Sequence, residues 1–439
     1  MFHQTIHYEE TFSRKVFSTV KKLPFLLGCI ADDFTGASDA ASFLVNQGVP
    51  TMLFNGIPAG TDSLECCAAV VIALKTRSIA VEDAVRDTLD AAEFLEKHKA
   101  RQLYIKYCST FDSTPKGNIG PTIDALMDKY NIPYTLLCPA LPVNKRIVKG
   151  GVLYVDDIPL SEGHMRNHPL NPMWDSNLAV LMQPQGKYPC LVLNAEQMSR
   201  PVHDLNELAQ NAARDGKHCY IIPDYADDAD GQRIVEVFGD IRLLTGGSGI
   251  LAPLAQRYVK EYDLEGLNII DSKCAGKGIA LSGSCSNATK EQIKVYRESG
   301  GTTLSIDPVK LLDGSQTIDS IWEFVQANNE PLIHSEQDAK RVEDSKGTAA
   351  KALEKAFSEI GRRAFDAGYT RIIVAGGETS GAVTLELNFD SFLIGESIAP
   401  GVPVMAPAKR QDIRIVLKSG NFGQPDFFRR AFEQTNSGN

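Results

Sequence analysis

The sequence predicts an α/β protein made of two α/β domains with largely parallel sheets and an active-site cleft between the domains. The chain has 439 residues, which is more than one hydrophobic core usually supports. Short apolar runs rich in Val, Ile and Leu alternate with amphipathic stretches, as expected of βαβ units around a parallel sheet. The pattern restarts after a charged segment at 260–266. We therefore expect an N-terminal extension over 1–24, a first domain over 25–265 and a second domain over 266–439.

The apolar runs define the expected strands in order. In the first domain these are 25–31, 69–74, 103–107, 134–138, 190–193 and 219–222, and in the second 278–282, 302–306, 371–375 and 413–418. An Ala-rich polar stretch within 325–365 has apolar residues at helical spacing, which predicts a surface helix. Ligands of such folds bind where loops leave the carboxyl ends of strands. The cleft between the domains is therefore the expected site.

The composition excludes several classes of partner. A formal net charge of −10 argues against nucleic acid and anionic membranes, which need a concentrated basic face. Nine cysteines without paired CxxC spacing indicate reduced thiols and a cytoplasmic location. No apolar run approaches the roughly 18 to 20 residues that cross a bilayer. Residues 1–24 contain Glu9 and Glu10 and lack the apolar core of a signal peptide.

The first candidate motif is a pair of carboxylates, Asp32 and Asp33, directly after the strand 25–31. Two carboxylates at a strand end can orient a hydroxyl, accept its proton or hold Mg²⁺. In a purely structural interpretation, Asp33 or Thr35 caps the next helix and Gly36 makes the turn. The motif alone leaves both interpretations open.

A second cluster follows the strand 103–107 and spans 106–118, with hydroxyls, a carboxylate and two lysines in one loop. Such a loop can bind a polyhydroxy acid through charge-assisted hydrogen bonds. The alternative is a loop in which Asp112 or Ser113 bonds to local backbone N–H groups. Lys106 is the residue hardest to explain structurally, because lysine is depleted in buried strands.

The segment from Gly150 to Trp174 shows no clean helical or strand period. Long irregular segments inside compact domains are usually binding loops or lids. Arg166 and His168 within it can meet the carboxylate of an acid substrate. A disordered surface loop is the alternative, which the apolar and proline content disfavours.

Glycine-rich turns between strands and helices recur in the second domain. Ser282–Thr289 and Gly376–Ala382 each follow a strand and precede a helix, a setting in which backbone N–H groups bind phosphate. Two such turns favour a nucleotide site over simple helix capping. The segments 400–403 and 418–423 add two tight turns, where glycine permits close approach of the backbone to a ligand.

Two common nucleotide signatures are absent or weak. The sequence has no GxxxxGK[ST] motif, which argues against a P-loop enzyme. Residues 247–252, GSGILA, fit the loose pattern GxGxxG/A and keep a dinucleotide-dependent dehydrogenase open as another class of protein. The nearest acidic residue at suitable spacing, Asp271, lies in the expected linker, so the required βαβ context is incomplete.

Taken together, these segments resemble the four-carbon acid sugar kinase family, most closely its 3-oxo-tetronate kinases. The motifs occur in the family's order between about residues 25 and 430: IADDFTGASDAASFLV (30–45), KYCSTFDSTPKGNIGP (106–121), CPALPVN (138–144), MRNHPLNPMWDSNL (165–178), LTGGSG (244–249), AGGETSGAV (375–383), APGVPV (399–404) and LKSGNFG (417–423). A long ordered set of this kind is more specific than any single motif.

The resemblance implies that the first domain binds an acid sugar and that the second binds ATP with Mg²⁺. It further implies phosphorylation of the terminal hydroxyl of 3-oxo-tetronate, giving 3-oxo-tetronate 4-phosphate. The ATP-binding candidates are Ser282, Ser284, Gly376, Gly377, Glu378, Thr379, Gly401 and Gly420. The substrate-binding candidates are Arg77, Lys106, Ser109, Asp112, Arg166 and His168. The protein ligands of the metal stay unassigned.

Phosphoryl transfer needs an aligned acceptor, charge neutralisation and exclusion of water. Our hypothesis is that Asp32 or Asp33 orients or deprotonates the acceptor hydroxyl, while Lys106 and Arg166 hold the substrate carboxylate. A threonate or erythronate kinase of the same fold is the nearest alternative; a dehydrogenase or a non-catalytic acid-sugar binding protein comes from other classes. The expected partner is a small acid sugar, not nucleic acid or membrane, and a homodimer is left open.

Overall fold

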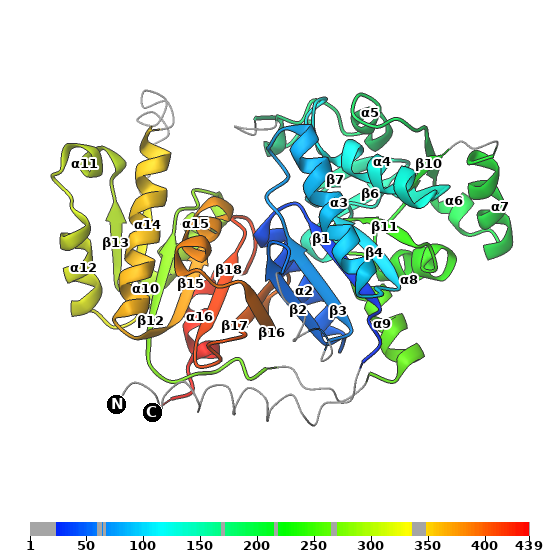
Figure 1. Cartoon of the computed structure of the whole chain (residues 1–439). Helices are drawn as coiled ribbons and strands as arrows, with labels where there is room; N and C mark the ends of the chain where they lie inside the picture. Colours follow the sequence, from blue (N-terminus) through cyan, green and yellow to red (C-terminus); the bar gives the residue numbers. More distant parts are fainter. Residues whose placement is uncertain are drawn as a thin grey trace.

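A computed structural model of the chain describes residues 23–58, 64, 67–167, 172–214, 218–264, 270–335 and 348–438. Within these residues the protein is a mixed α/β structure built on one 12-stranded sheet, with two separate three-stranded sheets. The N-terminal half of the chain, blue to green in Figure 1, lies on one side, and the C-terminal half, yellow to red, lies on the other. The mixed α/β class is confirmed. Residues 1–22 of the expected extension lie outside the described residues.

Every predicted apolar run overlaps a strand, and the structure adds strands that the sequence analysis did not predict. The strands are β1 (Leu27–Ala31), β2 (Thr51–Asn55), β3 (Ala69–Ala73), β4 (Gln102–Lys106), β5 (Tyr134–Leu136), β6 (Arg146–Lys149), β7 (Val152–Val155), β8 (Ile158–Pro159), β9 (Cys190–Leu193), β10 (Cys219–Pro223), β11 (Leu243–Gly246), β12 (Lys277–Ser282), β13 (Thr303–Ile306), β14 (Leu332–Ser335), β15 (Tyr369–Ala375), β16 (Ser391–Ala399), β17 (Val402–Pro407) and β18 (Arg414–Lys418).

Helices connect most of the parallel strands. They are α2 (Phe34–Asn46), α3 (Val81–Lys97), α4 (Ile119–Tyr130), α5 (Leu178–Met182), α6 (Ala195–Met198), α7 (Val202–Ala212), α8 (Asp228–Phe238), α9 (Leu251–Tyr262), α10 (Asn287–Glu298), α11 (Pro308–Asp313), α12 (Ile318–Ala327), α14 (Thr348–Asp366), α15 (Gly377–Leu387) and α16 (Phe427–Thr435), with 3₁₀ turns η2 (Pro142–Asn144) and η3 (His164–Asn167). The Ala-rich stretch forms α14, which buries one face, including Phe357 and Ile360.

The large sheet crosses the whole molecule in the order β11-β4-β1-β3-β2-β16-β17-β18-β15-β12-β14-β13. Strands of the N-terminal half pair in parallel, as do β18, β15, β12, β14 and β13 of the C-terminal half. The halves join where β16 pairs antiparallel with β2, with Phe392 opposite Leu53. The two expected sheets are thus continuous with each other, a junction that the sequence pattern did not indicate.

The junction reverses strand direction, because β16 is antiparallel to β2 and β17 and β17 is antiparallel to β18. In a flat sheet the carboxyl ends of β1 and β15 would then lie on opposite edges. Adjacent strands twist by roughly 20 to 25°, so the six steps from β1 to β15 accumulate about 120 to 150°. Irregular register in β16 between Ile394 and Ala399 adds local bending. This rotation brings the two sets of carboxyl ends face to face.

The segment expected to be irregular between Gly150 and Trp174 is only partly so. It contains β7 and β8, which form a small antiparallel sheet with β6. Asp156 and Asp157 make the tight turn between β7 and β8 at φ values of 52° and 65°, a conformation that Asp tolerates better than most residues. The strands are too short to show a period. In the described part of the chain, no helix is long and apolar enough to cross a membrane.

Candidate active site

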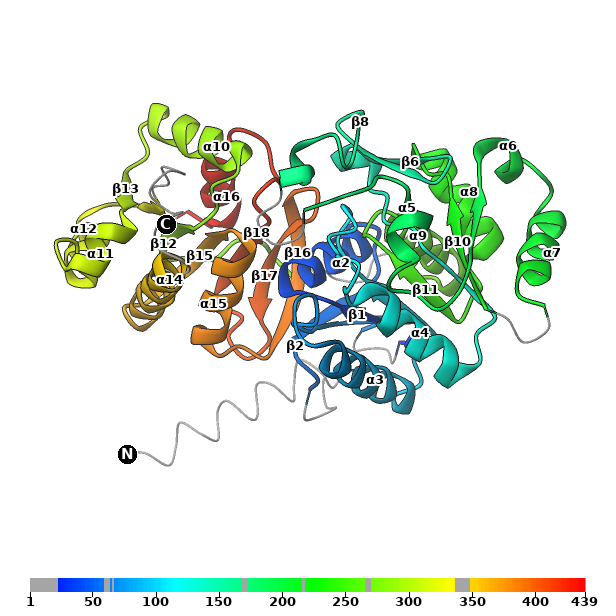
Figure 2. The same cartoon turned by 90° about the horizontal axis from the view of Figure 1, so that it is seen from above.

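A cleft of about 700 Å³ lies between the two halves and is lined by residues from both. From the N-terminal half it receives the residues that follow β1 and β3, including Asp33 and Arg77. From the C-terminal half it receives the turns that follow β12, β15 and β18. Figure 2 shows α2 and α15 beside each other between the halves. The site is therefore formed at the carboxyl ends of parallel strands, as the sequence predicts.

Three glycine turns pack tightly against one another on the C-terminal side of this cleft. They follow β12, β15 and β18, which are neighbours in the sheet. Gly376 has a φ of 114°, and its N–H donates to the Lys418 carbonyl at 2.8 Å. A Cβ on Gly283 would collide with Thr379 Oγ1, and one on Gly420 would lie 2.7 Å from Ser284 Oγ. These positions require glycine because the turns approach so closely.

The backbone carbonyl of Gly420, in the turn after β18, lies within hydrogen-bond distance of three side-chain donors. Ser286 Oγ, Thr289 Oγ1 and Lys418 Nζ lie 2.5, 2.8 and 3.0 Å from this oxygen. Lys418 is fully buried and has no carboxylate partner within the described residues; desolvation lowers its pKa to about 7. The three donors satisfy this carbonyl within the protein and fix the turn that lines the cleft.

A second cavity, of about 300 Å³, adjoins the cleft. Residues that line both cavities include Asp33, Arg77, Gly377 and Gly420. The second cavity extends from there along the loop after β4, past Ser109 and Thr110, to Arg146 on β6. Two adjoining compartments that share a wall fit a reaction between two substrates, one in each.

Asp32 and Asp33 have different environments although they are adjacent. Arg77 binds Asp32 bidentately, with Nε and NH2 each 2.8 Å from a carboxylate oxygen. Asp33 accepts a hydrogen bond from Gly36 N at 2.6 Å, which caps α2, and its other oxygen lies 3.0 Å from Arg77 NH1. Desolvation alone would lower the pKa of Arg77, but both carboxylates raise it well above its usual range. Of the pair, only Asp33 lines both cavities.

Two helices begin at the wall shared by the cavities. The residues at the N-terminus of α2 include Thr35, and those at the N-terminus of α15 include Gly377; both residues line both cavities. The free N–H groups and the dipole of a helix N-terminus favour anions. Two such ends at one position create a favourable environment for a phosphoryl group.

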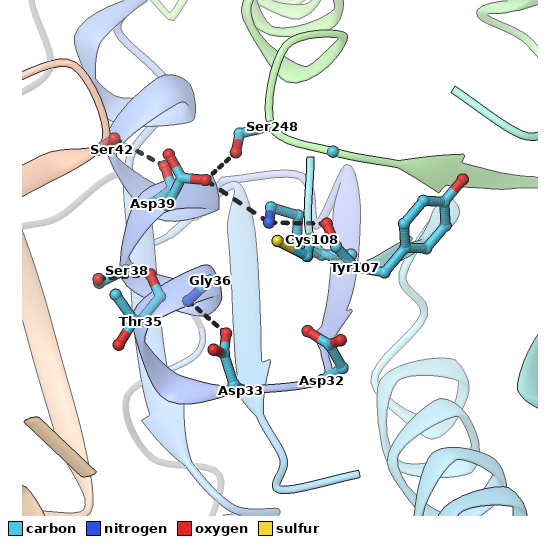
Figure 3. A network of polar contacts seen from close by, with 12 residues as sticks. Asp32, Asp33, Thr35, Gly36, Ser38, Asp39, Ser42, Tyr107, Cys108 and Ser248 are labelled. Carbon is cyan, nitrogen blue, oxygen red and sulfur yellow. Dashed lines mark hydrogen bonds and ion pairs between the residues drawn. The ribbon is translucent and has the colours of Figure 1, made fainter. Parts of the chain in front are cut away.

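Lys106 lies at the end of β4 and is almost fully buried. Its Nζ lies 3.6 Å from Asp39 Oδ2 and donates to the Tyr107 carbonyl at 3.0 Å. Figure 3 shows Asp39 pointing from α2 toward Ser248, which donates to the same carboxylate. Burial alone would lower the pKa of Lys106, but the charges of Asp39 and Asp32 raise it above its ordinary value. Desolvation raises the pKa of Asp39, whereas Lys106 and Ser248 act to lower it. The 3.6 Å contact makes Asp39 the charge partner of this lysine.

The structure brings most of the predicted site residues together. Those that line one or both cavities are Asp32, Asp33, Arg77, Lys106, Ser109, Asp112, Ser284, Gly376, Gly377, Glu378, Thr379 and Gly420. Arg166 is exposed and lines neither cavity, since the short turn η3 directs it to the surface. His168 lies outside the described residues.

Two predicted nucleotide contacts also lie away from the cavity walls. Ser282 is fully buried inside the end of β12, one residue before the turn. Gly401 makes the β16–β17 turn at a φ of 79°, and a Cβ there would meet Asp39 and Phe422. The absence of a side chain at Gly401 lets the backbone of the β16–β17 hairpin pack against these two side chains.

Sequence reasoning missed four charged residues of the site: Lys75 and Glu354 in the cleft, and Asp39 and Arg146 in the second cavity. Asp39 lies one helical turn after Thr35 in a motif that was singled out, so its spacing could have revealed it. Arg146 follows the quoted motif CPALPVN closely but has no local signal of its own. Lys75 directly follows the apolar run 69–74.

The GSGILA segment does not form a dinucleotide turn. A Cβ on Gly247 or Gly249 would collide with the carbonyls of Pro139 or Ala140, so these glycines serve close packing between chain segments. Ser248 is fully buried against Asp39. Backbone packing therefore explains these glycines without the dinucleotide fingerprint that the sequence left open as an alternative.

No group of three or more His, Cys, Asp or Glu side chains in the described residues is arranged to hold a metal ion. Mg²⁺ bound with a nucleotide relies mainly on phosphate oxygens and water, with only one or two carboxylates. Asp33 and Glu378 are carboxylates that line the cleft. The site therefore fits a metal that arrives with the nucleotide and does not fit a dedicated protein cage.

Comparison with known proteins agrees with this architecture. Residues 27–254 match the family of sugar-binding N-terminal domains, and residues 279–428 match that of nucleotide-binding C-terminal domains. The crystal structure of Haemophilus influenzae protein HI1011 has a TM-score of 0.74 and 39% identity over 92% of this chain and 99% of that chain. A crystal structure from Salmonella typhimurium LT2 has a TM-score of 0.82 and 39% identity over 94% and 100%. The chain thus has the sugar-binding and nucleotide-binding halves of one class of two-domain protein.

Curated relatives specify the family further. The chain is 40% identical to the 3-oxo-tetronate kinase of Haemophilus influenzae, over 92% of this chain and 99% of the relative. It is also 40% identical to the 3-oxo-tetronate kinase of Brucella melitensis, over 92% and 94%. The chain belongs to the 3-oxo-tetronate kinase family.

Proposed function

We propose that the protein is an ATP-dependent kinase that transfers phosphate to the 4-hydroxyl of 3-oxo-tetronate, giving 3-oxo-tetronate 4-phosphate and ADP. The observation that carries this proposal is the junction of the two cavities at Asp33, Gly377 and Gly420. A nucleotide in the larger cleft and an acid sugar in the smaller cavity would meet there. The names of the curated relatives at 37–40% identity support the substrate.

ATP fits the larger cleft, because the glycine turns after β12, β15 and β18 bring close-packed backbone to its wall. Helix α15 also begins there, with the free N–H groups of a helix N-terminus. Ser284, Gly376–Thr379 and Gly420 would hold the phosphates, and Lys75 adds a cation beside them. Glu378 would hold the Mg²⁺ that accompanies ATP, together with phosphate oxygens and water. The bound nucleotide supplies the phosphoryl group, and the metal neutralises phosphate charge.

Asp33 would orient the acceptor hydroxyl and accept its proton, since it lines both cavities. Gly36 and Arg77 hold the two oxygens of this carboxylate, so its position is set before substrate binds. The N-termini of α2 and α15 stabilise negative charge at the shared wall. Closure of the two halves around the cleft would exclude water from the transfer. We assign acid-sugar binding to residues 25–265 and ATP binding to residues 266–439, and expect the enzyme to be cytoplasmic.

The test is ADP release with ATP and Mg²⁺ against D- and L-threonate, D- and L-erythronate and the matching 3-oxo acids. We expect a strong preference for one 3-oxo acid. Preference for a tetronate would keep the fold and replace the substrate, which is the second candidate because the two acids differ by one oxidation level at one carbon. No ADP release with any of these acids would overturn the proposal.

A further inference from the structure

The second cavity has three cationic side chains on its walls: Arg77, Lys106 and Arg146. The first two are already neutralised. Arg77 binds Asp32 and Asp33, and Lys106 lies 3.6 Å from Asp39. A cation that is held by a carboxylate has less charge to offer a ligand, and separating such a pair costs free energy. The third cation therefore decides where an anionic group of the substrate can bind.

Arg146 has the opposite environment. It is the first residue of β6, and only 8% of its surface is exposed. Its NH1 donates to the Asn144 carbonyl, but its Nε is buried without a hydrogen-bond partner. Within the described residues, no ion pair joins its guanidinium to a carboxylate. Desolvation lowers the pKa of Arg146, and the nearby charges of Asp156 and Asp39 offset it only in part.

A buried, unpaired guanidinium at a cavity wall is unfavourable unless a ligand supplies the counter-charge. Its planar donors match the two oxygens of a carboxylate, to which arginine binds bidentately. Arg146 lines the second cavity and does not line the nucleotide cleft. A carboxylate bound to it would lie away from the wall where the two cavities meet.

We propose that Arg146 binds the carboxylate of the acid substrate and thereby sets the substrate's direction, with the opposite end of the carbon chain at Asp33. This inference rests on the proposed kinase function and specifies its substrate-binding site. It gives Arg146 the role that the sequence analysis gave to Lys106 and Arg166. Selection for an acid over a neutral sugar would then depend on a residue of the small β6–β8 sheet.

The experiment compares ADP release with the preferred acid and with its primary amide, which has the same shape and no charge. The variants are Arg146→Gln, Arg146→Lys and, as a matched control, Lys145→Gln. Lys145 is the adjacent residue, is exposed (74% of its side chain) and pairs only at 3.8 Å with Asp156. Each variant removes or retains one positive charge at nearly the same place in the chain.

We expect Arg146→Gln to lower kcat/KM for the acid about 10- to 100-fold, as for loss of a charge-assisted hydrogen bond. The loss should appear in KM for the acid, with KM for ATP and kcat/KM for the amide within about threefold of wild type. Arg146→Lys should fall between wild type and Arg146→Gln, and it carries the test if the glutamine variant does not fold. Lys145→Gln should behave as wild type.

Equal losses for the acid and the amide, or an unchanged KM for the acid, would overturn the assignment of Arg146. A wild-type enzyme that releases no ADP with any acid would overturn the kinase proposal instead. In that case, calorimetric binding of the acids to wild type and Arg146→Gln tests the carboxylate site alone. Weaker binding to the variant supports the site, whereas equal binding, or no binding to the wild type, removes it.

Discussion

Arg77 and Asp32 form a bidentate ion pair, with two N···O distances of 2.8 Å, and the same guanidinium lies 3.0 Å from Asp33. One arginine therefore joins two adjacent carboxylates whose other surroundings differ. Asp32 uses both of its oxygens to hold Arg77, and Asp33 faces both cavities. The sequence analysis assigned the acceptor hydroxyl to either Asp32 or Asp33. The structure distinguishes them, because Asp32 positions Arg77 and Asp33 is available to the acceptor hydroxyl.

Asp33→Asn should lower kcat by about 10²- to 10⁴-fold, the usual contribution of a general base. The fold should persist, because Asn caps helices about as well as Asp. Steady-state kinetics with saturating ATP and acid measures the effect. Asp227→Asn is the control, since Asp227 caps α8 with hydrogen bonds to Ala229 N and Asp230 N and lines neither cavity. A kcat within a few-fold of wild type would remove Asp33 from the mechanism.

Asp32→Asn should lower the free energy of unfolding by about 1–3 kcal/mol, because the neutral amide replaces a charge-assisted pair that is largely shielded from solvent. Urea unfolding measures this change. Asp83→Asn serves as the comparison: its partner Arg86 is 60% exposed and Asp83 is 50% exposed, so little change in the free energy of unfolding is expected there. Equal changes in the free energy of unfolding would mean that the Asp32–Arg77 ion pair stabilises the fold no more than the exposed Asp83–Arg86 pair does.

Lys418 should make stability depend on pH. Its pKa is about 7 in the folded protein against an ordinary value of 10.5. Between these values the unfolded chain binds a proton that the folded chain does not, so the free energy of unfolding rises with pH. The stabilisation of the folded protein by neutral Lys418 is fully present above pH 10.5. It falls progressively as the pH is lowered from 10.5 and is lost once the pH has passed through 7.

Lys418→Met should remove this dependence. Between pH 7 and 9, the unfolding free energy of wild type minus that of the variant should rise by at most about 1.4 kcal/mol per pH unit. Denaturant unfolding at several pH values gives both curves. Lys294→Met, at a site where 60% of the side chain is exposed, should leave the wild-type dependence intact. Parallel curves for wild type and Lys418→Met would show that Lys418 is charged in the folded protein at neutral pH.

Gly420→Ala should weaken nucleotide binding, because the added Cβ would lie 2.7 Å from Ser284 Oγ and displace one glycine turn from another. Overpacking of about 1–3 kcal/mol corresponds to a rise in KM for ATP of about 5- to 140-fold. KM for the acid should change much less. Gly163→Ala is the control, since a Cβ there meets only ordinary contacts at 3.8 Å or more. An unchanged KM for ATP would exclude this turn from the nucleotide site.

The sequence alone predicted most of the strands that are continuous apolar runs and the glycine turns that carry the site. Runs such as AVVIA and YTRIIVA are buried along their whole length or nearly so in β3 and β15, and such runs are a local property that needs no knowledge of the partner strand. The glycine turns after β12, β15 and β18 were predicted for the same reason. Short strands such as β7 and β8 were missed because they are too short to show a period. Longer strands were missed as well: β2, β16 and β17, which join the two halves, span five, nine and six residues.

Tertiary structure decided which of these residues meet. Asp39 and Ser248 are 209 positions apart and hydrogen-bonded, and no local pattern distinguishes Lys106, which such a pair neutralises, from Arg146, which forms no ion pair in the described part of the chain. Pairing of β16 with β2 and the accumulated twist of the sheet brought the two sets of strand ends face to face. The sequence by itself determined the α/β elements and the chemistry available at their ends, because local propensity and burial set these. Only the folded chain decided the charge on each wall of the site, because that depends on contacts between segments far apart in sequence.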